Sequence, residues 1–274
     1  MGLVNSVLRK FFYFLFFPVQ TLSPWFALSL VSILTALFLL AIYRLVSDQP
    51  GIKATKDKIK AYLLELRLFS DDFLTSFRAQ TSLLFWNLKY FLHALRPLAV
   101  MIIPLIFILS HLDLWFGWRP LPVGQTTVVR VRLKENFSPL SIEARIEPAS
   151  GYEVETPALR IEETKEINWR IRGLKPGEHE IIIVLNGQRI TKKLSVGPGS
   201  FLALSRTRPS SGLISELLAP GEKPLPDSPV REVSVVYPPR RLALFGWKLH
   251  WLVAYFVLSI LVGFILKKPL RVEI

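Results

Sequence analysis

Residues 44–96 read RLVSDQPGIKATKDKIKAYLLELRLFSDDFLTSFRAQTSLLFWNLKYFLHALR, a charged segment between two long hydrophobic stretches. The segment holds nine Lys and Arg residues against five Asp and Glu residues. A basic excess in a short segment between membrane spans is typical of the cytoplasmic side. We therefore expect residues 44–96 to form a cytoplasmic helical hairpin. The location of every other segment follows from the side of the membrane that this hairpin occupies.

The composition predicts an integral membrane protein. Of the 274 residues, 51% are hydrophobic, the mean hydropathy is +0.37, and the apolar residues come in blocks long enough to cross a bilayer. The net charge of +13 is spread along the chain, which suits membrane lipids with anionic headgroups. A nucleic-acid groove would need a dense basic stripe, so no specific nucleic-acid partner is expected.

The sequence lacks the patterns of an enzyme. There is no cysteine, and no two of the four histidines are spaced as metal ligands usually are. We find no nucleophile with an adjacent base and no phosphate-binding loop. The expectation is therefore no catalytic residue, no metal and no cofactor.

The first hydrophobic stretch predicts one span preceded by an interfacial segment. Residues 11–43 carry no charge over 33 residues, which is longer than the roughly 20 residues of one span and too short for two. We expect the aromatic run before Pro18 to lie along the interface and Trp25–Tyr43 to cross. A cleaved signal peptide starting at Arg9 and Lys10 is the alternative, but no small-residue cleavage site follows it.

The first arm of the hairpin predicts an amphipathic helix with a basic stripe. Lys53, Lys56, Lys60 and Arg67 follow helical spacing along one face. Contact with anionic lipid is the default interpretation of this stripe. Docking of a ribosome, a translocon or another acidic partner is the alternative.

The second arm begins after a turn at residues 70–72 and is far more apolar. This arm is expected to pack on the first arm and to graze the membrane. Its apolar stripe comprises Phe73, Phe77, Leu84, Leu88 and Leu95, and it is widened by Phe85, Trp86, Tyr90 and Phe91. A second span follows from Pro97, and Pro104 predicts a kink within it. Five tryptophans are expected to be interfacial anchors. They are Trp25, Trp115, Trp118, Trp247 and Trp251.

After Arg119 the hydrophobic pattern changes from helical to alternating. Val129, Val131 and Leu133 alternate with charged residues, and Asn186-Gly187 is a strong hairpin signal. Strands of this kind with turns about every ten residues indicate an immunoglobulin-like sandwich. The stretch that follows is rich in Pro, Ser and Gly and is expected to be a linker.

The predicted fold is an α-helical membrane protein with three transmembrane helices, a cytoplasmic hairpin and an inserted all-β immunoglobulin-like sandwich. Parity places the N-terminus and the β-domain outside and the hairpin and C-terminus in the cytoplasm, in a bacterial-type inner membrane. The expected segments are 1–24 interfacial, 25–43 first span, 44–96 hairpin, 97–118 second span, 119–200 β-domain, 201–245 linker, 246–266 third span and 267–274 tail.

This order of segments resembles the YidC family of membrane protein insertases. The wider superfamily includes the core subunit of the endoplasmic-reticulum membrane protein complex and the Get-pathway receptor. The matching features are Phe11–Pro24 as an interfacial helix, Lys56–Lys60 opening the hairpin, Ser70–Asp72 at its tip, and Leu98–Leu109 with Pro104 in the return span. The resemblance covers about residues 1–115 and the third span.

The resemblance implies a substrate groove. Its candidate residues are Ser29, Ser32, Thr35, Arg44 and Pro104. YidC-like proteins place an arginine inside the membrane, whereas Arg44 lies at the cytoplasmic border and snorkelling to headgroups is its simpler role. For the hydroxyl row, packing against a neighbouring helix is the alternative to lining a groove. The β-domain has no counterpart in the family core, and the later YidC spans are missing. The resemblance therefore implies a reduced or diverged member, for which a second membrane subunit that completes the groove is an expected partner.

Two functions from different classes follow. The first is a membrane protein insertase or biogenesis factor that receives hydrophobic client proteins beside the hairpin and the first two spans. The alternative is a membrane-anchored scaffold or sensor that binds a partner through its β-domain.

Overall fold

The computed structural model describes residues 2–19, 23–198, 201–244, 246–270 and 272. Parts of the expected N-terminal segment (20–22), β-domain (199–200), linker (245) and tail (271, 273–274) lie outside the described residues. The chain divides into two compact units, which we describe separately. One comprises residues 28–105 and 252–274, and the other comprises residues 1–27 and 106–251.

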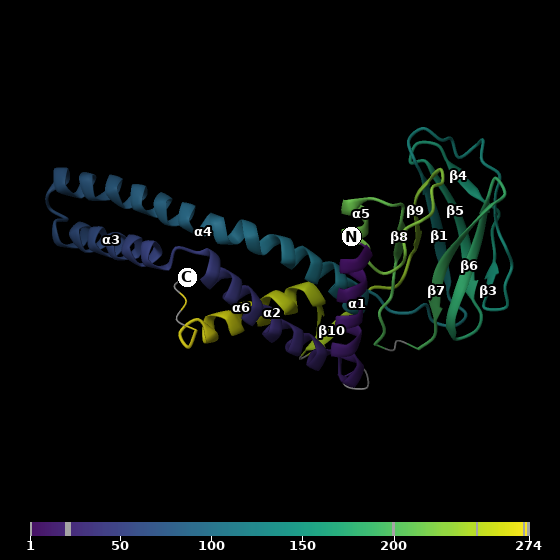
Figure 1. Ribbon diagram of the computed structural model, residues 1–274, viewed down its shortest axis with the longest axis horizontal. Helices are drawn as coiled ribbons and strands as arrows, with labels where there is room; N and C mark the ends of the chain where they lie inside the picture. Colours follow the sequence, from purple (N-terminus) through teal and green to yellow (C-terminus); the bar gives the residue numbers. More distant parts are fainter. Residues whose placement is uncertain (1, 20–22, 199–200, 245, 271, 273–274) are drawn as a thin grey trace. The chain divides into compact units, whose positions relative to one another are not determined.

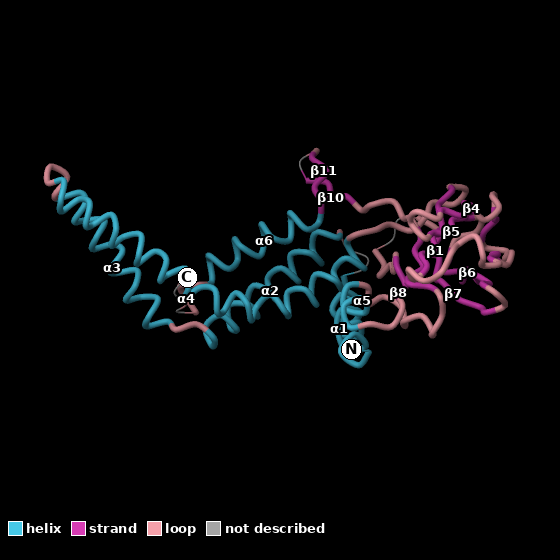
Figure 2. Tube along the Cα trace, turned by 90° about the horizontal axis from the view of Figure 1, so that it is seen from above, coloured by secondary structure: helices cyan, strands magenta, loops and turns pink. Residues whose placement is uncertain are grey.

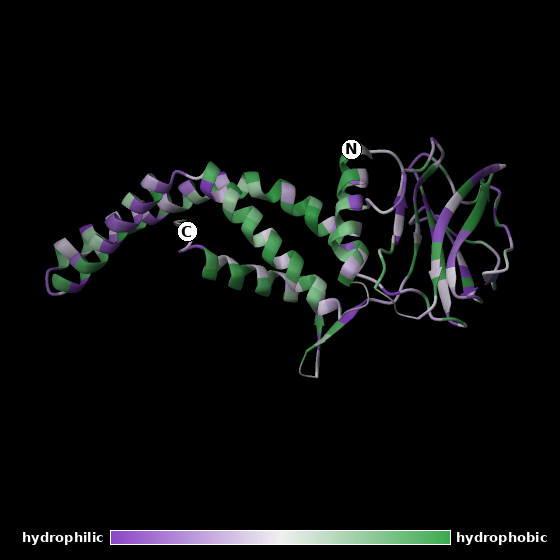
Figure 3. Cartoon of the chain, turned by 60° about the horizontal axis from the view of Figure 1, so that its bottom comes forward, coloured by the Kyte–Doolittle hydropathy of each residue, from purple (hydrophilic) through white to green (hydrophobic). Residues whose placement is uncertain are grey.

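The first unit is helical. Helix α2 (Pro24–Val46) and helix α4 (Phe73–Phe116) are both long and apolar enough to cross a membrane. Helix α6 (Trp251–Leu266) is shorter: its 16 residues extend about 24 Å, against a hydrocarbon core of about 30 Å. Hydrophobic residues dominate these helices, while polar residues gather on the hairpin (Figure 3).

Helix α4 differs from the sequence expectation of a separate second span. It runs for 44 residues without a break, so the second arm of the hairpin and the second span form one helix. Pro97 and Pro104 both lie inside it, and no glycine interrupts it between residues 73 and 116. A proline removes one backbone hydrogen bond, and a long apolar helix tolerates that loss.

Helix α3 (Gln49–Leu68) and the first half of α4 form the expected hairpin, lying side by side (Figure 1, Figure 2). Asp48 caps α3, because its carboxylate accepts a hydrogen bond from the Gly51 N–H at 3.0 Å. The turn at residues 69–72 confirms the predicted tip. Asp72 caps α4, accepting hydrogen bonds from the Leu74 N–H at 3.1 Å and the Thr75 hydroxyl at 2.6 Å.

The second unit contains an antiparallel β-domain, which confirms the inserted β-domain in coarse form. Its strands are β1 (Thr126–Leu133), β2 (Ala144–Ile146), β3 (Tyr152–Val154), β4 (Leu159–Ile161), β5 (Glu166–Gly173), β6 (Gly177–Leu185), β7 (Gln188–Val196), β8 (Thr207–Pro209) and β9 (Val230–Val235). One sheet has the order β3-β5-β1-β9-β8 with β4 also paired to β5, and the other has the order β2-β6-β7.

The core of this domain is formed by the alternating apolar residues that the sequence predicted to face inward. Val129, Val131 and Leu133 point inward from β1 and pack with residues of both sheets. Asn186 and Gly187, with φ angles of 48° and 82°, form the tight turn between β6 and β7. Both residues adopt positive φ, which Asn and Gly tolerate best.

The structure corrects the expectation that residues 201–245 form a linker. Most of it belongs to the β-domain: β8 and β9 complete the larger sheet, and helix α5 (Leu213–Leu218) lies between them. Val233, Val235 and Tyr237 are in the core. Prolines flank these strands, and the alternation of buried and exposed residues in them is too short to be recognised in the sequence.

The expected start of the third span is also different. Strands β10 (Arg241–Leu244) and β11 (Trp247–His250) pair as a separate hairpin, so helix α6 begins only at Trp251. The turn uses Gly246, whose φ is +84°.

Helix α1 (Gly2–Phe16), followed by a short 3-10 turn (η1, Phe17–Val19), packs within the second unit against the last turns of α4. Phe12 stacks on His111 at 5.6 Å between ring centres, and Phe16 packs edge-on against Trp115 at 5.0 Å. Asn5 ties the helix to α5 through a 2.8 Å hydrogen bond to the Glu216 carbonyl. Residues 2–16 of the expected interfacial segment therefore form a helix that is held in place by its aromatic side chains.

Candidate functional site

The hairpin is held together by one seam of side chains from each helix. On α3 the seam comprises Ile52, Thr55, Ile59, Tyr62 and Leu66, and on α4 it comprises Ala79, Leu83, Trp86, Tyr90 and His93. These positions alternate in steps of three and four, the spacing of a two-helix coiled coil. Ile52, Thr55 and Ala79 are buried, and the other seam residues are half-buried.

Two polar contacts fix the register near the base of the hairpin. The Lys56 ammonium lies 5.9 Å above the ring of Tyr90, within reach of a cation–π interaction. The His93 imidazole lies 3.9 Å from the Asp48 carboxylate. Both contacts link α3 or its cap to α4.

The second arm lies against α3 as expected, with Trp86 and Tyr90 in the seam, but its main apolar stripe points away from α3. Phe73 is 79% exposed and Leu84 is 71% exposed. We call this surface the outer face. It comprises Phe73, Phe77, Leu84, Leu88, Phe91, Leu95, Leu98 and Ile102. At about 100° per residue, these positions share one side of the helix, roughly 140° from the seam.

The outer face extends from the hairpin tip into the first turns of the expected second span, and the polar residues Gln80 and Thr81 interrupt it between Phe77 and Leu84. All eight residues are exposed. Only 6% of the most apolar stretch of α4 is buried, against 39% for α2. A large contiguous apolar surface on a protein marks a binding surface or a lipid contact. This surface extends beyond the expected span into the charged hairpin.

The proposed groove residues are not assembled into one open surface. Ser32 and Thr35 are buried, Ser29 and Pro104 are half-buried, and Arg44 is exposed. The helix-packing alternative therefore fits Ser32 and Thr35 better than the groove interpretation. A hydroxyl with no access to a passing segment cannot line its path.

Thr35 faces helix α6 instead. The Tyr255 hydroxyl lies near the hydroxyl groups of Thr35 and Ser259 without completing a hydrogen bond to either. Among the described residues, the buried hydroxyls of Ser32, Tyr255 and Ser259 have no hydrogen-bond partner. Buried polar atoms usually have a hydrogen-bond partner, so the contact between α2 and α6 contains polar groups with unused hydrogen-bonding capacity.

The basic residues of the hairpin remain accessible. Lys53, Lys60 and Arg67 are exposed, and Lys56 is half-buried over Tyr90. Lys60 makes an exposed ion pair with Asp57 at 3.5 Å, which contributes little to stability. Three of the four residues of the basic stripe are thus exposed.

No family model, curated protein or solved structure matches the chain.

Two of the five expected interfacial anchors are buried. Trp115 packs between the rings of Phe16 and Phe201, at 5.0 and 5.3 Å. Trp251 is buried as well. These two side chains belong to an aromatic cluster and do not reach lipid headgroups.

The other three tryptophans are more accessible. Trp247 is 76% exposed on β11. Trp25 and Trp118 are half-buried, and each donates its indole N–H, Trp25 to the Ala243 carbonyl at 2.8 Å and Trp118 to the Asp113 carboxylate at 3.1 Å. Partial exposure with a satisfied N–H is compatible with an interfacial position.

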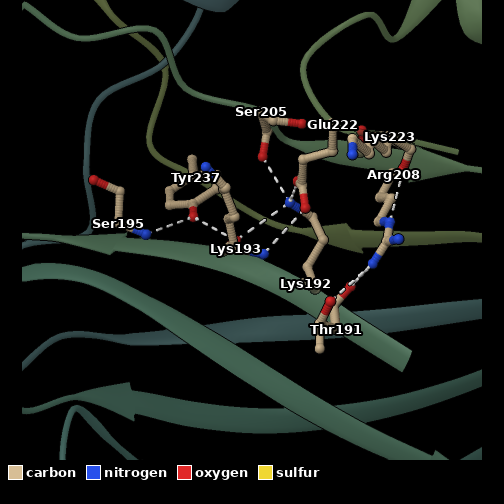
Figure 4. A network of polar contacts seen from close by, with 10 residues as sticks. Thr191, Lys192, Lys193, Ser195, Ser205, Arg208, Glu222, Lys223 and Tyr237 are labelled. Carbon is tan, nitrogen blue, oxygen red and sulfur yellow. Dashed lines mark hydrogen bonds and ion pairs between the residues drawn. The ribbon is translucent and has the colours of Figure 1, made fainter. Parts of the chain in front are cut away.

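The β-domain contains a buried ion pair that the sequence pattern does not indicate (Figure 4). Lys192 is 0% exposed and its ammonium pairs with the Glu222 carboxylate. The ammonium also donates to the Ser205 carbonyl at 2.8 Å. Burial lowers the pKa of Lys192, and the charge of Glu222 opposes that shift.

The same network of hydrogen bonds connects β7 to the segment that follows it. The Glu222 carboxylate accepts the Lys193 backbone N–H at 3.2 Å, and Arg208 donates to the Lys223 carbonyl at 2.8 Å. Tyr237 accepts the Ser195 N–H at 3.0 Å, and burial raises the pKa of its phenol. Isolated Lys, Glu and Tyr residues in a proline-rich stretch carry no pattern from which such a network follows.

Proposed function

We propose that the chain is a membrane-protein insertase or biogenesis factor that guides hydrophobic client segments along α4. The outer face carries this proposal, because it presents exposed apolar residues along one side of α4 from the hairpin to Ile102, with one polar break at Gln80 and Thr81. The seam uses the opposite side of α4. The hairpin therefore holds its shape without covering the row.

The mechanism is passive transfer between apolar surfaces. A client segment leaving water first buries side chains against the hairpin part of the outer face, at about 1.5–3 kcal/mol for each large side chain fully buried. It then moves along the same helix side toward lipid, where its own burial drives insertion. No nucleotide is needed. The shortness of α6 favours local bilayer thinning, which lowers the cost of moving a polar flank.

The proposed setting is a bacterial-type inner membrane with the hairpin in the cytoplasm. The excess of Lys and Arg in residues 44–96 supports this orientation. Lys53, Lys60 and Arg67 would contact anionic lipid, a ribosome or a translocon. The resemblance to YidC-like insertases agrees with the hairpin between two apolar helices, and the lack of an intramembrane arginine favours a partner subunit.

Site-directed photocrosslinking in native membranes tests the proposal. Probes at Leu84, Leu88 and Ile102 lie on the outer face, and probes at Leu83 and Ser32 are matched controls on the same or a neighbouring helix. We expect newly made membrane proteins to crosslink to the outer-face probes at several times the level of the controls. Adducts formed only with lipid, or equally at both sets, would contradict client binding.

A scaffold or sensor is the second candidate, and one surface of the β-domain favours it. Leu140, on the loop before β2, and Leu159, in β4, are exposed apolar residues. Arg160 of β4 donates a 3.2 Å hydrogen bond to the Ile142 carbonyl and links the two segments. Deletion of residues 121–239 separates the two functions, because this range also removes β8 and β9. An insertase retains client crosslinks on the outer face, whereas a scaffold loses its partner.

A further inference from the structure

Strands β10 and β11 form a two-stranded hairpin that joins neither sheet of the β-domain (Figure 2). This β10–β11 hairpin belongs to the second unit. The Trp25 indole N–H donates to the Ala243 carbonyl at 2.8 Å, which ties β10 to the first turn of α2. A two-stranded hairpin is at best marginally stable in water unless another surface covers it. The exposed parts of the β10–β11 hairpin therefore need a further surface to contact.

The register of the two strands separates a basic face from an apolar face. Arg241 pairs with His250, and Ala243 pairs with Lys248. Residues directly opposite each other in an antiparallel pair point to the same side, so Arg241 and Lys248 are diagonal neighbours on one face, about 7–8 Å apart. The opposite face carries four apolar side chains, Leu242, Leu244, Trp247 and Leu249.

Both faces are accessible. Arg241, Lys248 and His250 are exposed. On the apolar face, Leu242 is buried, whereas the pair beside the turn is open: Trp247 is 76% exposed and Leu244 is 40% exposed. The accessible apolar surface therefore lies at the tip of the β10–β11 hairpin.

No acidic side chain balances the basic face. Residues 233–272 contain no Asp or Glu. Among the described residues, neither Arg241 nor Lys248 has an ion-pair partner. Two neighbouring cations without counter-charges suit phosphate groups. The surface that meets this face should therefore be anionic.

The chain continues from the β10–β11 hairpin directly into an apolar helix. Helix α6 begins at Trp251, the residue after β11. Its 16 residues extend about 24 Å, which is less than the hydrocarbon thickness of about 30 Å. A short span brings its flanking residues into the interface, where tryptophan and cationic side chains are favoured. In the proposed membrane setting, the β10–β11 hairpin therefore meets the headgroup layer.

We propose that the β10–β11 hairpin binds the anionic phospholipids of the leaflet that surrounds the start of α6. Arg241 and Lys248 contact the phosphates, and Leu244 and Trp247 enter the outer part of the acyl region. A soluble acidic partner would match the charges and leave the apolar tip in water. A bilayer interface offers phosphate and hydrocarbon next to each other. The proposal rests on the membrane setting of the chain and not on client binding to the outer face.

Fluorescence quenching in lipid vesicles tests this contact. The chain has no cysteine, so Leu244→Cys and Ala243→Cys each carry a single fluorophore, on opposite faces of β10. The full chain is reconstituted in phosphatidylcholine vesicles that contain a quencher on the acyl chains, with and without phosphatidylglycerol. We expect the probe on Leu244→Cys to be quenched several times more strongly than the probe on Ala243→Cys, because its face points toward the acyl chains.

Charge variants identify the lipid class. Phosphatidylglycerol should increase the quenching of Leu244→Cys by about twofold or more, because Arg241 and Lys248 are attracted to its headgroups. Arg241→Gln with Lys248→Gln should abolish this increase. Lys175→Gln with Lys223→Gln removes the same charge from exposed positions outside the β10–β11 hairpin and should retain it. Arg241→Lys with Lys248→Arg keeps the charge and should also retain it, which separates loss of charge from misfolding.

A probe on Ile260→Cys reports insertion of α6 itself, since Ile260 is 54% exposed on this helix. If it is quenched while Leu244→Cys and Ala243→Cys are quenched equally, the proposed contact of the apolar tip is wrong. An equal effect of phosphatidylglycerol in both Gln double variants would overturn the role of Arg241 and Lys248. Absence of quenching at Ile260→Cys would contradict the membrane setting and the lipid contact together. Client crosslinking to the outer face is measured separately, so its failure is distinguishable from each of these outcomes.

Discussion

At the residue scale, the Lys192–Glu222 pair makes the most specific stability prediction. Glu222→Gln leaves a buried ammonium without its counter-charge, which costs about 3–5 kcal/mol. Lys192→Met with Glu222→Leu removes both charges and should cost less. Urea unfolding of the full chain in detergent, followed by amide hydrogen exchange of β7, measures both. A single variant no less stable than the double variant would contradict the role of the pair.

The same variant has a predictable pH dependence. Burial already lowers the pKa of Lys192, and loss of the Glu222 charge lowers it further. Unfolded Lys keeps its ordinary pKa of about 10.4, so above the folded pKa the unfolded state binds more protons. The stability of Glu222→Gln should therefore rise with pH up to about 10.4. A flat or falling profile relative to wild type would contradict this assignment.

Asp72 gives a second titration at the tip of the hairpin. Hydrogen bonds from Thr75 hold the pKa of Asp72 below its ordinary value. The cap therefore stabilises α4 above the unfolded pKa, about 3.9, and its contribution is lost as pH falls through the lower folded pKa. We expect the Thr75 amide shift in NMR spectra to change in that range. Asp71→Asn should keep this transition, and Asp72→Asn should abolish it.

At the element scale, the seam predicts opposite effects for matched alanines of the hairpin. Ala79 is buried between α3 and α4, whereas Ala61 on α3 is exposed. Ala79→Leu should overfill the seam and destabilise the hairpin by about 1–3 kcal/mol. Ala61→Leu should change its stability little. Hydrogen exchange of α3 amides reports both, and equal exchange rates would mean that the seam is assigned wrongly.

The hairpin also shows what could be read from sequence and what could not. Its two helices and its turn at Ser70–Asp72 follow from charge, capping and periodicity. The packing side does not, because Phe77 and Leu84 are more hydrophobic than the seam residues Ala79 and Tyr90. A rule that buries the most apolar side inside the protein fails when that side has an apolar environment of its own.

The β-domain was predictable where alternation is long and not where it is short. Strand β1 has four inward residues in a row of eight, which identifies it unambiguously. Strand β9 has six residues between prolines, and β8 has three. Strand β9 takes its place by pairing with β1 across about a hundred residues, and β8 then pairs with β9. Local sequence does not encode either pairing.

At the candidate site, the sequence of α2 left two interpretations of its polar row open, a groove lining and helix packing. Ser32 and Thr35 share a helix side, as their spacing requires. The sequence of α2 alone does not reveal that Tyr255 of α6 occupies that side. The exposed fractions distinguish the two surfaces: Ser32 and Thr35 are buried, whereas the outer face on α4 is accessible.

At the scale of the whole molecule, each unit contributes a different kind of surface. The helical unit carries the apolar outer face beside the accessible Lys53 and Arg67. In the other unit, Phe12 joins α1 to His111 of α4, and Asn5 joins α1 to Glu216 of α5 beside the β-domain strands. Because α1 packs within this unit, the N-terminus and the β-domain should lie on the same side of a membrane.

Cysteine labelling tests this topology directly, because the chain has no cysteine of its own. Single substitutions Lys10→Cys, Lys58→Cys and Lys175→Cys place a thiol at exposed positions on α1, the hairpin and the β-domain. With a membrane-impermeant maleimide on intact spheroplasts, we expect labelling of Lys10→Cys and Lys175→Cys and protection of Lys58→Cys until lysis. Nine basic residues in the hairpin region outweigh Arg9 and Lys10 in setting the orientation. The reverse pattern would place the outer face outside the cell, where no client emerges from a ribosome, whereas labelling of all three thiols before lysis would contradict membrane crossing by α2 and α4.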